Sequence, residues 1–224
     1  MDVRIHGTVA QTAQLSLQKD ESLWASKGSI VSYSSGLEWD VRVPGGISAA
    51  VKRVFSGEGV ALARIVATSD EQRVTLGANE PGHIASWDLA DEGPVLTTRG
   101  AFLAAWGSNI EISIAVARRA GAALFGGAGL VLQRVEGSGT VLIHGRGDFQ
   151  REELREGEEI IVSTGNLAAF AKTVGYDVQR VGALRKTLFG KEGFFMTRLA
   201  GPGIVLLQTL KRGQNISRSR LSAG

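Results

Sequence analysis

The feature that most constrains this fold is an internal repeat, because one arrangement of residues occurs three times along the 224-residue chain. Each copy contains a phenylalanine, three residues, a glycine, four more residues and an arginine. The positions that fill this arrangement are Phe55, Gly59 and Arg64, then Phe125, Gly129 and Arg134, then Phe189, Gly193 and Arg198. Self-similarity at a nearly fixed spacing is the signature of a fold that uses one structural unit several times.

A second motif precedes each of these arrangements, and it centres on a glycine that follows a leucine by eleven residues. These glycines are Gly28, Gly100 and Gly165. Between the two motifs an acid stands among apolar residues, at Glu38, Glu111 and Asp177. The order of features is the same in every copy. We therefore predict three repeats, over about residues 13–67, 85–145 and 150–208, within a single β domain that spans residues 1–210.

The local pattern within the repeats is typical of strands. Apolar residues alternate with more polar ones over residues 37–43 and 110–116, which is the period of a half-buried strand. Short aliphatic runs bounded by Gly, Ser or Asp, such as residues 130–135 and 204–207, favour core strands. The predicted fold class is all-β, an antiparallel β-sandwich or short double-stranded β-helix built from the three repeats. Short helices are expected between strands, over residues 47–54, 115–124 and 181–188.

Composition excludes several classes of protein. The 30 glycines make up about 13% of the chain, against roughly 7% in average proteins, and many fall at matching turn positions of the copies. Turns that need a positive φ explain such glycines without a ligand. The absence of cysteine excludes disulfide scaffolds, zinc fingers, iron–sulfur clusters and thiol catalysis.

The charge of the chain is concentrated at its C-terminal end. The formal net charge is +3, from 25 basic and 22 acidic residues. Residues 211–224 hold four basic residues and no acid, so the rest of the chain has 21 basic and 22 acidic residues and a net charge of −1. We predict that residues 211–224 form a basic, disordered tail. Contact of this tail with nucleic acid or an anionic membrane is the alternative.

No catalytic or metal-binding constellation stands out in the sequence. The histidines His6, His83 and His144 are scattered, and His144 is expected at the surface where a strand ends. Neither a Gly-x-Ser-x-Gly elbow nor a phosphate-binding Walker loop occurs. No apolar stretch reaches the 18 to 20 residues of a membrane span. We therefore expect a cytoplasmic protein that is not an enzyme and has no catalytic, cofactor-binding or metal-binding residues.

The repeated charges lead to one structural hypothesis. Acids recur at one position of the copies (Glu38, Glu111, Asp177) and arginines at another (Arg64, Arg134, Arg198). We predict that at least some of these side chains form ion pairs, because such pairs would fix the register of neighbouring strands.

Several runs resemble a known family. They include Leu124-Phe-Gly-Gly-Ala-Gly-Leu, Ser163-Thr-Gly-Asn-Leu-Ala-Ala-Phe and Leu188-Phe-Gly-Lys-Glu-Gly-Phe. The chain resembles the altered-inheritance-of-mitochondria family, in its uncharacterised bacterial branch, up to about Leu210. The resemblance implies a fold similar to that of tryptophan RNA-binding attenuator protein, which builds oligomers. It supplies no catalytic residues.

The functional expectation follows from the predicted strands. A β-repeat fold has sheet edges that must be covered, which favours a homo-oligomer. We expect an assembly or scaffold protein that acts through its surface, with a protein partner as a further option. The alternative is a module, similar to the attenuator protein, that binds RNA or a small ligand.

Overall fold

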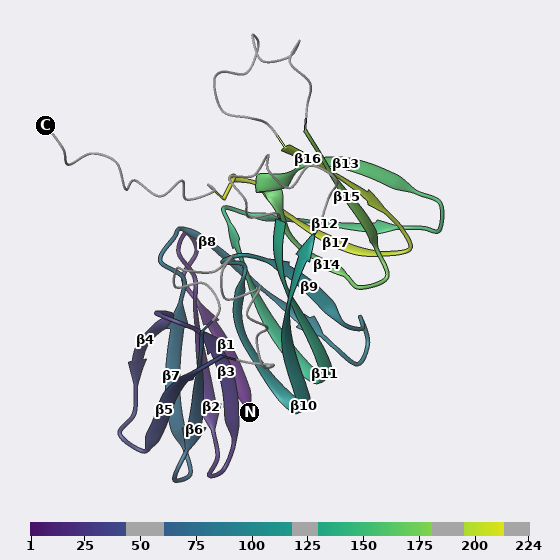
Figure 1. Cartoon of the computed structure of the whole chain (residues 1–224). Coiled ribbons are helices and arrows are strands. Elements are labelled where there is room, and N and C mark those ends of the chain that lie inside the picture. The colour runs from purple at the N-terminus through teal and green to yellow at the C-terminus, as the bar shows by residue number, and fades with distance from the viewer. Residues whose placement is uncertain (44–60, 118–129, 181–194, 213–224) are drawn as a thin grey trace, which may run out of the picture.

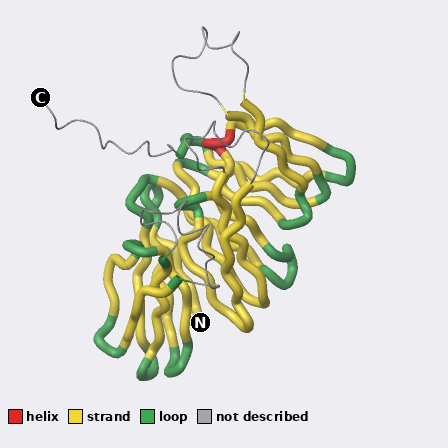
Figure 2. The backbone as a smooth tube through the Cα atoms, viewed as in Figure 1, coloured by secondary structure: helices red, strands yellow, loops and turns green. Residues whose placement is uncertain are grey.

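The computed structural model describes residues 1–43, 61–117, 130–180 and 195–212. The described chain is built almost entirely of strands, which form layered sheets (Figures 1 and 2). The all-β prediction is therefore confirmed. Within these ranges the single helical element is a 3₁₀ turn, η2 (Thr164–Asn166).

The strands follow one another as β1 (Asp2–His6), β2 (Thr12–Leu17), β3 (Ser22–Ser26), β4 (Ile30–Tyr33), β5 (Leu37–Arg42), β6 (Leu62–Ala67), β7 (Gln72–Gly77), β8 (Gly82–Asp88), β9 (Val95–Thr98), β10 (Phe102–Ala117), β11 (Leu130–Arg146), β12 (Phe149–Leu154), β13 (Glu159–Ser163), β14 (Leu167–Ala171), β15 (Gly175–Arg180), β16 (Phe195–Ala200) and β17 (Gly203–Gln208).

One set of four antiparallel pairings organises the first segment, residues 12–77. Strand β7 pairs with β2 and β4, and β6 pairs with β3 and β5. The same set occurs in the third segment, residues 149–208, where β17 pairs with β12 and β14, and β16 pairs with β13 and β15.

The second segment, residues 82–146, uses the same four pairings with longer strands. The C-terminal half of β11 pairs with β8 and with the N-terminal half of β10. The N-terminal half of β11 pairs with β9 and with the C-terminal half of β10. Each long strand therefore takes the place of two shorter strands, which belong to two different sheets in the other segments.

A β-bulge lies at the same place in each segment. The register shifts between Ile30 and Ser32 in β4, between Phe102 and Ala104 in β10, and between Leu167 and Ala169 in β14. A bulge sets two residues against one on the partner strand and increases the local twist. Equivalent residues can therefore be identified from the register, independently of the sequence motifs.

The segments are joined edge to edge in the same way at both internal junctions. Strand β3 of the first segment pairs with β10 of the second, with Trp24 opposite Ala105. Strand β9 of the second segment pairs with β14 of the third, with Leu96 opposite Phe170. Both junctions are antiparallel. They produce a sheet that runs without interruption from β12 to β5.

Two apolar clusters form the core. One joins the two sheets of the first segment around Leu15, Leu23 and Ile65. The other joins the second and third segments around Trp87, Phe102 and Phe170, the largest fully buried side chains. The indole Nε1 of Trp87 donates a hydrogen bond to the carbonyl of Gly93, so its polar atom is satisfied within the core.

The structure tests only a small part of the helices predicted from the sequence. Ala115–Ala117 lie in strand β10, so the prediction of a helix beginning at Ala115 is wrong there. The reason is that residues 111–117 pair with β11, which satisfies their backbone in a sheet. The rest of the three predicted helices lies outside the described residues, as do Phe55, Phe125, Phe189, Gly59, Gly129 and Gly193. By sequence position each phenylalanine–glycine motif falls between the two strands of a hairpin.

Candidate functional site

Several strands end their sheets, and two of them, β4 and β13, lie at opposite ends of the molecule (Figure 1). Strand β4 pairs with β7 alone, and β13 pairs with β16 alone, among the residues that the structure describes. The strands equivalent to these two in the interior have partners on both sides, because they form the two junctions. Among the described residues, the open edges of β4 and β13 are thus the two halves of such a junction, each without its partner.

The open edge of β4 carries exposed apolar side chains. Val31 is 63% exposed and Tyr33 is 50% exposed. By register, Tyr33 corresponds to Ala105 in β10 and to Phe170 in β14, both of which are fully buried. The equivalents of Val31, Leu103 and Ala168, are buried as well. The same strand position is therefore buried wherever a neighbouring strand covers it.

The open edge of β13 shows the same contrast. Ile161 is 65% exposed and lies opposite Arg198 in the register of β16. The residues opposite Arg64 and Arg134 in the other segments are Trp24 and Leu96. Leu96 is 6% exposed and Trp24 is half-buried, with the guanidinium of Arg64 5.9 Å from the centre of its ring.

A buried polar cluster lies where the three segments meet, and Arg212 is at its centre. Nη1 of Arg212 donates to Glu80 Oε2 at 3.0 Å, and Nη2 donates to the His144 carbonyl at 3.0 Å and to Gln208 Oε1 at 3.3 Å. Arg146 donates from Nη1 to the Lys211 carbonyl at 2.6 Å, and its Nε lies 3.4 Å from Glu80 Oε2. One carboxylate therefore faces two guanidinium groups.

Burial controls the charge of this cluster. His144 is 1% exposed, and its burial and the nearby positive charge of Arg212 lower its pKa to about 4. The imidazole is therefore neutral at pH 7. Burial also lowers the pKa of Arg212, although Glu80 opposes this effect. The side-chain atoms His144 Nε2, Arg146 Nε and Arg212 Nε have no hydrogen-bond partner in the part of the chain that the structure describes.

These positions correct two sequence expectations. His144 was expected at the surface, but it lies within the long strand β11, where β8 and β10 cover both edges. Arg212 was assigned to the disordered tail, yet its side chain packs into the polar cluster and its backbone NH donates to the carbonyl of Gly165. Residues 213–224 of that tail lie outside the described residues.

A cavity of about 350 Å³ lies beside the polar cluster, at the junction between the first and second segments. Its walls come from the β3–β4 turn, from residues 77–80 and from the β9–β10 turn. Gly28 and Gly100 stand in these two turns with φ values of +81° and +80°, as the predicted turn role requires. Gly165 instead lies in the 3₁₀ turn, without a positive φ.

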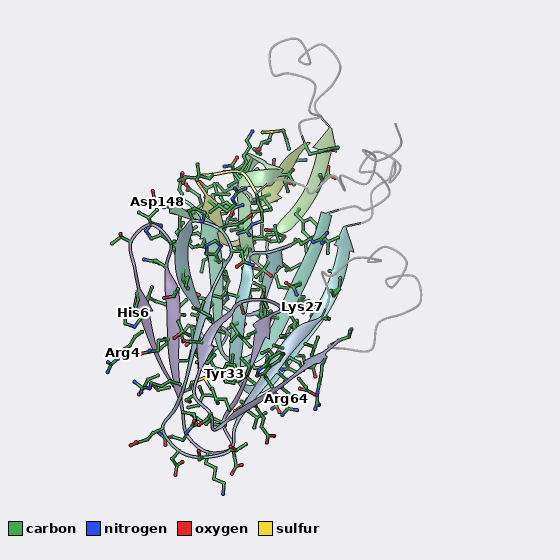
Figure 3. The ribbon with its side chains drawn as sticks, turned by 90° about the vertical axis from the view of Figure 1, so that its left-hand side faces the viewer. Arg4, His6, Lys27, Tyr33, Arg64 and Asp148 are labelled. Atoms are coloured by element: carbon green, nitrogen blue, oxygen red, sulfur yellow. The ribbon has the colours of Figure 1, made fainter. Side chains whose placement is uncertain are left out.

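The repeated arginines Arg64, Arg134 and Arg198 differ in the groups that they contact. Asp177 lies directly opposite Arg198, and its charge contributes to the raised pKa of that guanidinium, but the stronger partner is Glu159, 2.9 Å from Nε. Arg134 pairs with Glu136. Figure 3 labels Arg64, the arginine that lies over Trp24.

The acids differ in register between the copies. Glu38 and Glu111 lie opposite Val66 and Glu136, two residues before the position that Asp177 takes in its own segment. Neither has an ion pair within the described part of the chain. The sequence alignment of the third acid is thus shifted by two residues from the structural register.

The sequence does not predict which strands have an open edge. Val31, Tyr33 and Ile161 read as ordinary strand residues, and their exposure depends on which neighbour is absent. The only indication in the sequence is that the equivalent positions are apolar in all three copies. Among the described residues no group of three His, Asp or Glu side chains could hold a metal ion, and no helix is long and apolar enough to cross a membrane.

Comparison with known proteins gives one family and one fold. The family model described as mitochondrial biogenesis AIM24 matches residues 3–210. A crystal structure of a Streptococcus pyogenes protein is similar over 94% of this chain and 94% of its own, with a TM-score of 0.74 and 20% sequence identity. No curated protein matches the sequence.

Proposed function

The chain belongs to the mitochondrial biogenesis AIM24 family, as its motifs predicted, and from that premise we propose that it is a self-assembling scaffold rather than an enzyme. Each of its three segments is one two-sheet sandwich unit, and units are joined by edge pairing. Copies of the chain join by the same pairing, with β4 of one copy against β13 of the next. The recurrence of four strand pairings in every segment supports the repeated unit.

The two internal junctions supply a template for the contact between copies. In both junctions the residue opposite the repeated arginine pairs with the second residue after the bulge: Trp24 with Ala105, and Leu96 with Phe170. The equivalent pair at the open edges is Ile161 with Tyr33. One position along, Val162 would face Ser32. The two internal junctions therefore define the register of the proposed interface.

The exposed apolar side chains at both edges are the observation that carries this proposal. Burial of a large apolar side chain contributes about 1.5 to 3 kcal/mol, and Val31, Tyr33 and Ile161 would all gain it at this interface. The backbone groups along both edges would also find partners in place of water. Together these gains oppose the loss of translational and rotational freedom on association.

The assembly is head to tail, since the two surfaces in contact are different. Such a heterologous interface closes into a ring if the rotation between copies returns to the start, and grows into a filament if it does not. Either form repeats the sandwich unit at regular intervals, which suits a scaffold that presents one surface many times.

Light scattering on the purified chain tests this proposal. The wild-type protein should show a mass of several multiples of 23.7 kDa. Tyr33→Lys places a charge on the open edge, and this variant should shift to the mass of one chain while it keeps its β-sheet circular dichroism.

The matched control is Val9→Lys, at a position 71% exposed that lies in neither edge strand. It should assemble like the wild type. A wild-type mass of a single chain at high micromolar concentration would refute the proposal, and so would an unchanged assembly in the Tyr33→Lys variant.

A further inference from the structure

The cavity between the first two segments combines three properties: a volume suited to a small molecule, positively charged side chains in its wall and a buried guanidinium nitrogen, Arg212 Nε, without a hydrogen-bond partner among the described residues. We propose that it binds a small organic anion, with a carboxylate held between Arg99 and Arg212 and an apolar body against Phe102. This inference goes beyond assembly, because the cavity lies within one chain and uses neither open edge.

The volume and the lining favour a ligand with two kinds of surface. About 350 Å³ lies within the usual range of small-molecule sites, roughly 300 to 1,000 Å³. Leu62, Phe102 and Leu103 supply apolar walls, whereas Arg99 and Arg212 supply charge. A site with apolar walls and a few convergent polar groups fits an apolar molecule that carries one charged group.

The charge balance favours an anion. Glu80 is the one acid among the described residues of the lining, and its carboxylate already faces both Arg212 and Arg146. Arg99 is exposed at the rim and forms no ion pair with any residue that the structure describes. Bidentate contact with a carboxylate is the geometry that a guanidinium fork favours.

An unsatisfied polar atom of the cavity wall provides an independent argument. Arg212 lines the cavity, and its Nε is buried without a hydrogen-bond partner among the described residues. A buried polar group left unpaired costs about 1 to 3 kcal/mol. A ligand carboxylate held by this guanidinium can accept a hydrogen bond from Nε, which gives that atom the partner it lacks.

Arg212 brings the third segment into this site. Its walls come from the first and second segments, whereas Arg212 follows β17 of the third. Its side chain passes directly beside Gly100, where a Cβ atom would lie 2.8 Å from Nη1. The ligand would therefore contact elements of all three segments, and its binding should stabilise the full chain against unfolding.

Nuclear magnetic resonance of the ¹⁵N-labelled full chain tests the inference with benzoate, benzamide and inorganic phosphate as probes. Benzoate should shift the amide signals of Gly28 and Gly100 and reach saturation. Benzamide has the same shape without the charge, so it should bind at least tenfold more weakly. Tighter binding of phosphate than of benzoate would overturn the assignment of an apolar body, and equal binding of benzamide would overturn the anion site.

Two variants identify the residues that bind. Arg99→Gln changes an exposed side chain and should weaken benzoate binding at least tenfold. Arg73→Gln is the matched control, because Arg73 is exposed on β7 and does not line the cavity. Unchanged affinity in Arg99→Gln, or no response to benzoate in the folded wild type, would refute the site. Tyr33→Lys should bind benzoate normally, so the result is independent of the outcome for assembly.

Discussion

Strands β14 and β4 have the same place in their segments and opposite surroundings. Both pair with the last strand of their own segment, through a bulge at the same position. The second edge of β14 is covered by β9, and all five of its residues are buried. The second edge of β4 has no neighbouring strand among the described residues, and Val31, Ser32 and Tyr33 are exposed. The comparison shows that equivalent strand positions are buried where a neighbouring strand covers them and exposed where none does.

The largest effect is expected when a charge is placed on the covered version of this strand. Ala105→Lys would bury an ammonium group at a fully buried junction position, and we expect a loss of about 3 to 5 kcal/mol in the free energy of unfolding. Tyr33→Lys, the equivalent change on the open edge, should leave the monomer folded. Chemical denaturation of both variants makes this comparison, and a similar loss in the two would contradict it.

A second prediction concerns the middle of the long strand β11, between its pairing with β9 and its pairing with β8. Gly139 has a φ of +150°, and a Cβ atom there would lie 2.1 Å from the carbonyl oxygen of Trp106. Gly139→Ala should therefore cost about 2 to 4 kcal/mol, from backbone strain and overlap. Gly157 has a φ of +78° with open space around it, so Gly157→Ala should cost only about 1 kcal/mol. The midpoints of thermal unfolding of Gly139→Ala and Gly157→Ala test whether β11 needs a glycine at position 139.

The third prediction is a pH dependence that arises in the buried cluster and not at the edges. Burial lowers the pKa of His144 to about 4, below its ordinary value of 6.5. The unfolded chain therefore binds this proton more readily, and stability should fall by about 1 to 3 kcal/mol as the pH drops from 6.5 to 4. Below pH 4 this contribution stays constant. In His144→Gln the loss over this range should be smaller, and an identical pH profile in both proteins would refute the assignment.

The smallest effect is expected from the exposed charges. Arg198 and Glu159 form their ion pair on the surface, where water and salt weaken it. Glu159→Gln should change the midpoint of thermal unfolding by no more than about 1 °C. Glu136 lies between Arg134 and Lys172, and these contacts lower the pKa of its carboxyl group. Glu136→Gln should therefore have the larger effect, and the reverse order would contradict this view of the charges.

The sequence predicted the parts of this fold that depend on local pattern. Alternation over residues 110–116 and the aliphatic run 204–207 identified strands that the structure contains. It could not predict that β10 and β11 each take the place of two shorter strands, because a long strand and two short ones have the same alternation. The burial of His144 and Arg212 depends on contacts between residues 60 or more positions apart, for which a single sequence carries no signal. The open edges have the same origin, since exposure there follows from how strands are joined.

One mixing experiment tests the head-to-tail interface most directly. Tyr33→Lys blocks the β4 edge and Ile161→Lys blocks the β13 edge, so each variant alone should have the mass of one chain, 23.7 kDa. Mixed in equal amounts, each variant still offers one intact edge to the other. Native mass spectrometry should then show a one-to-one dimer of twice the chain mass and nothing larger. A mixture that stays monomeric, or variants that still assemble alone, would contradict the proposed pairing of β4 with β13.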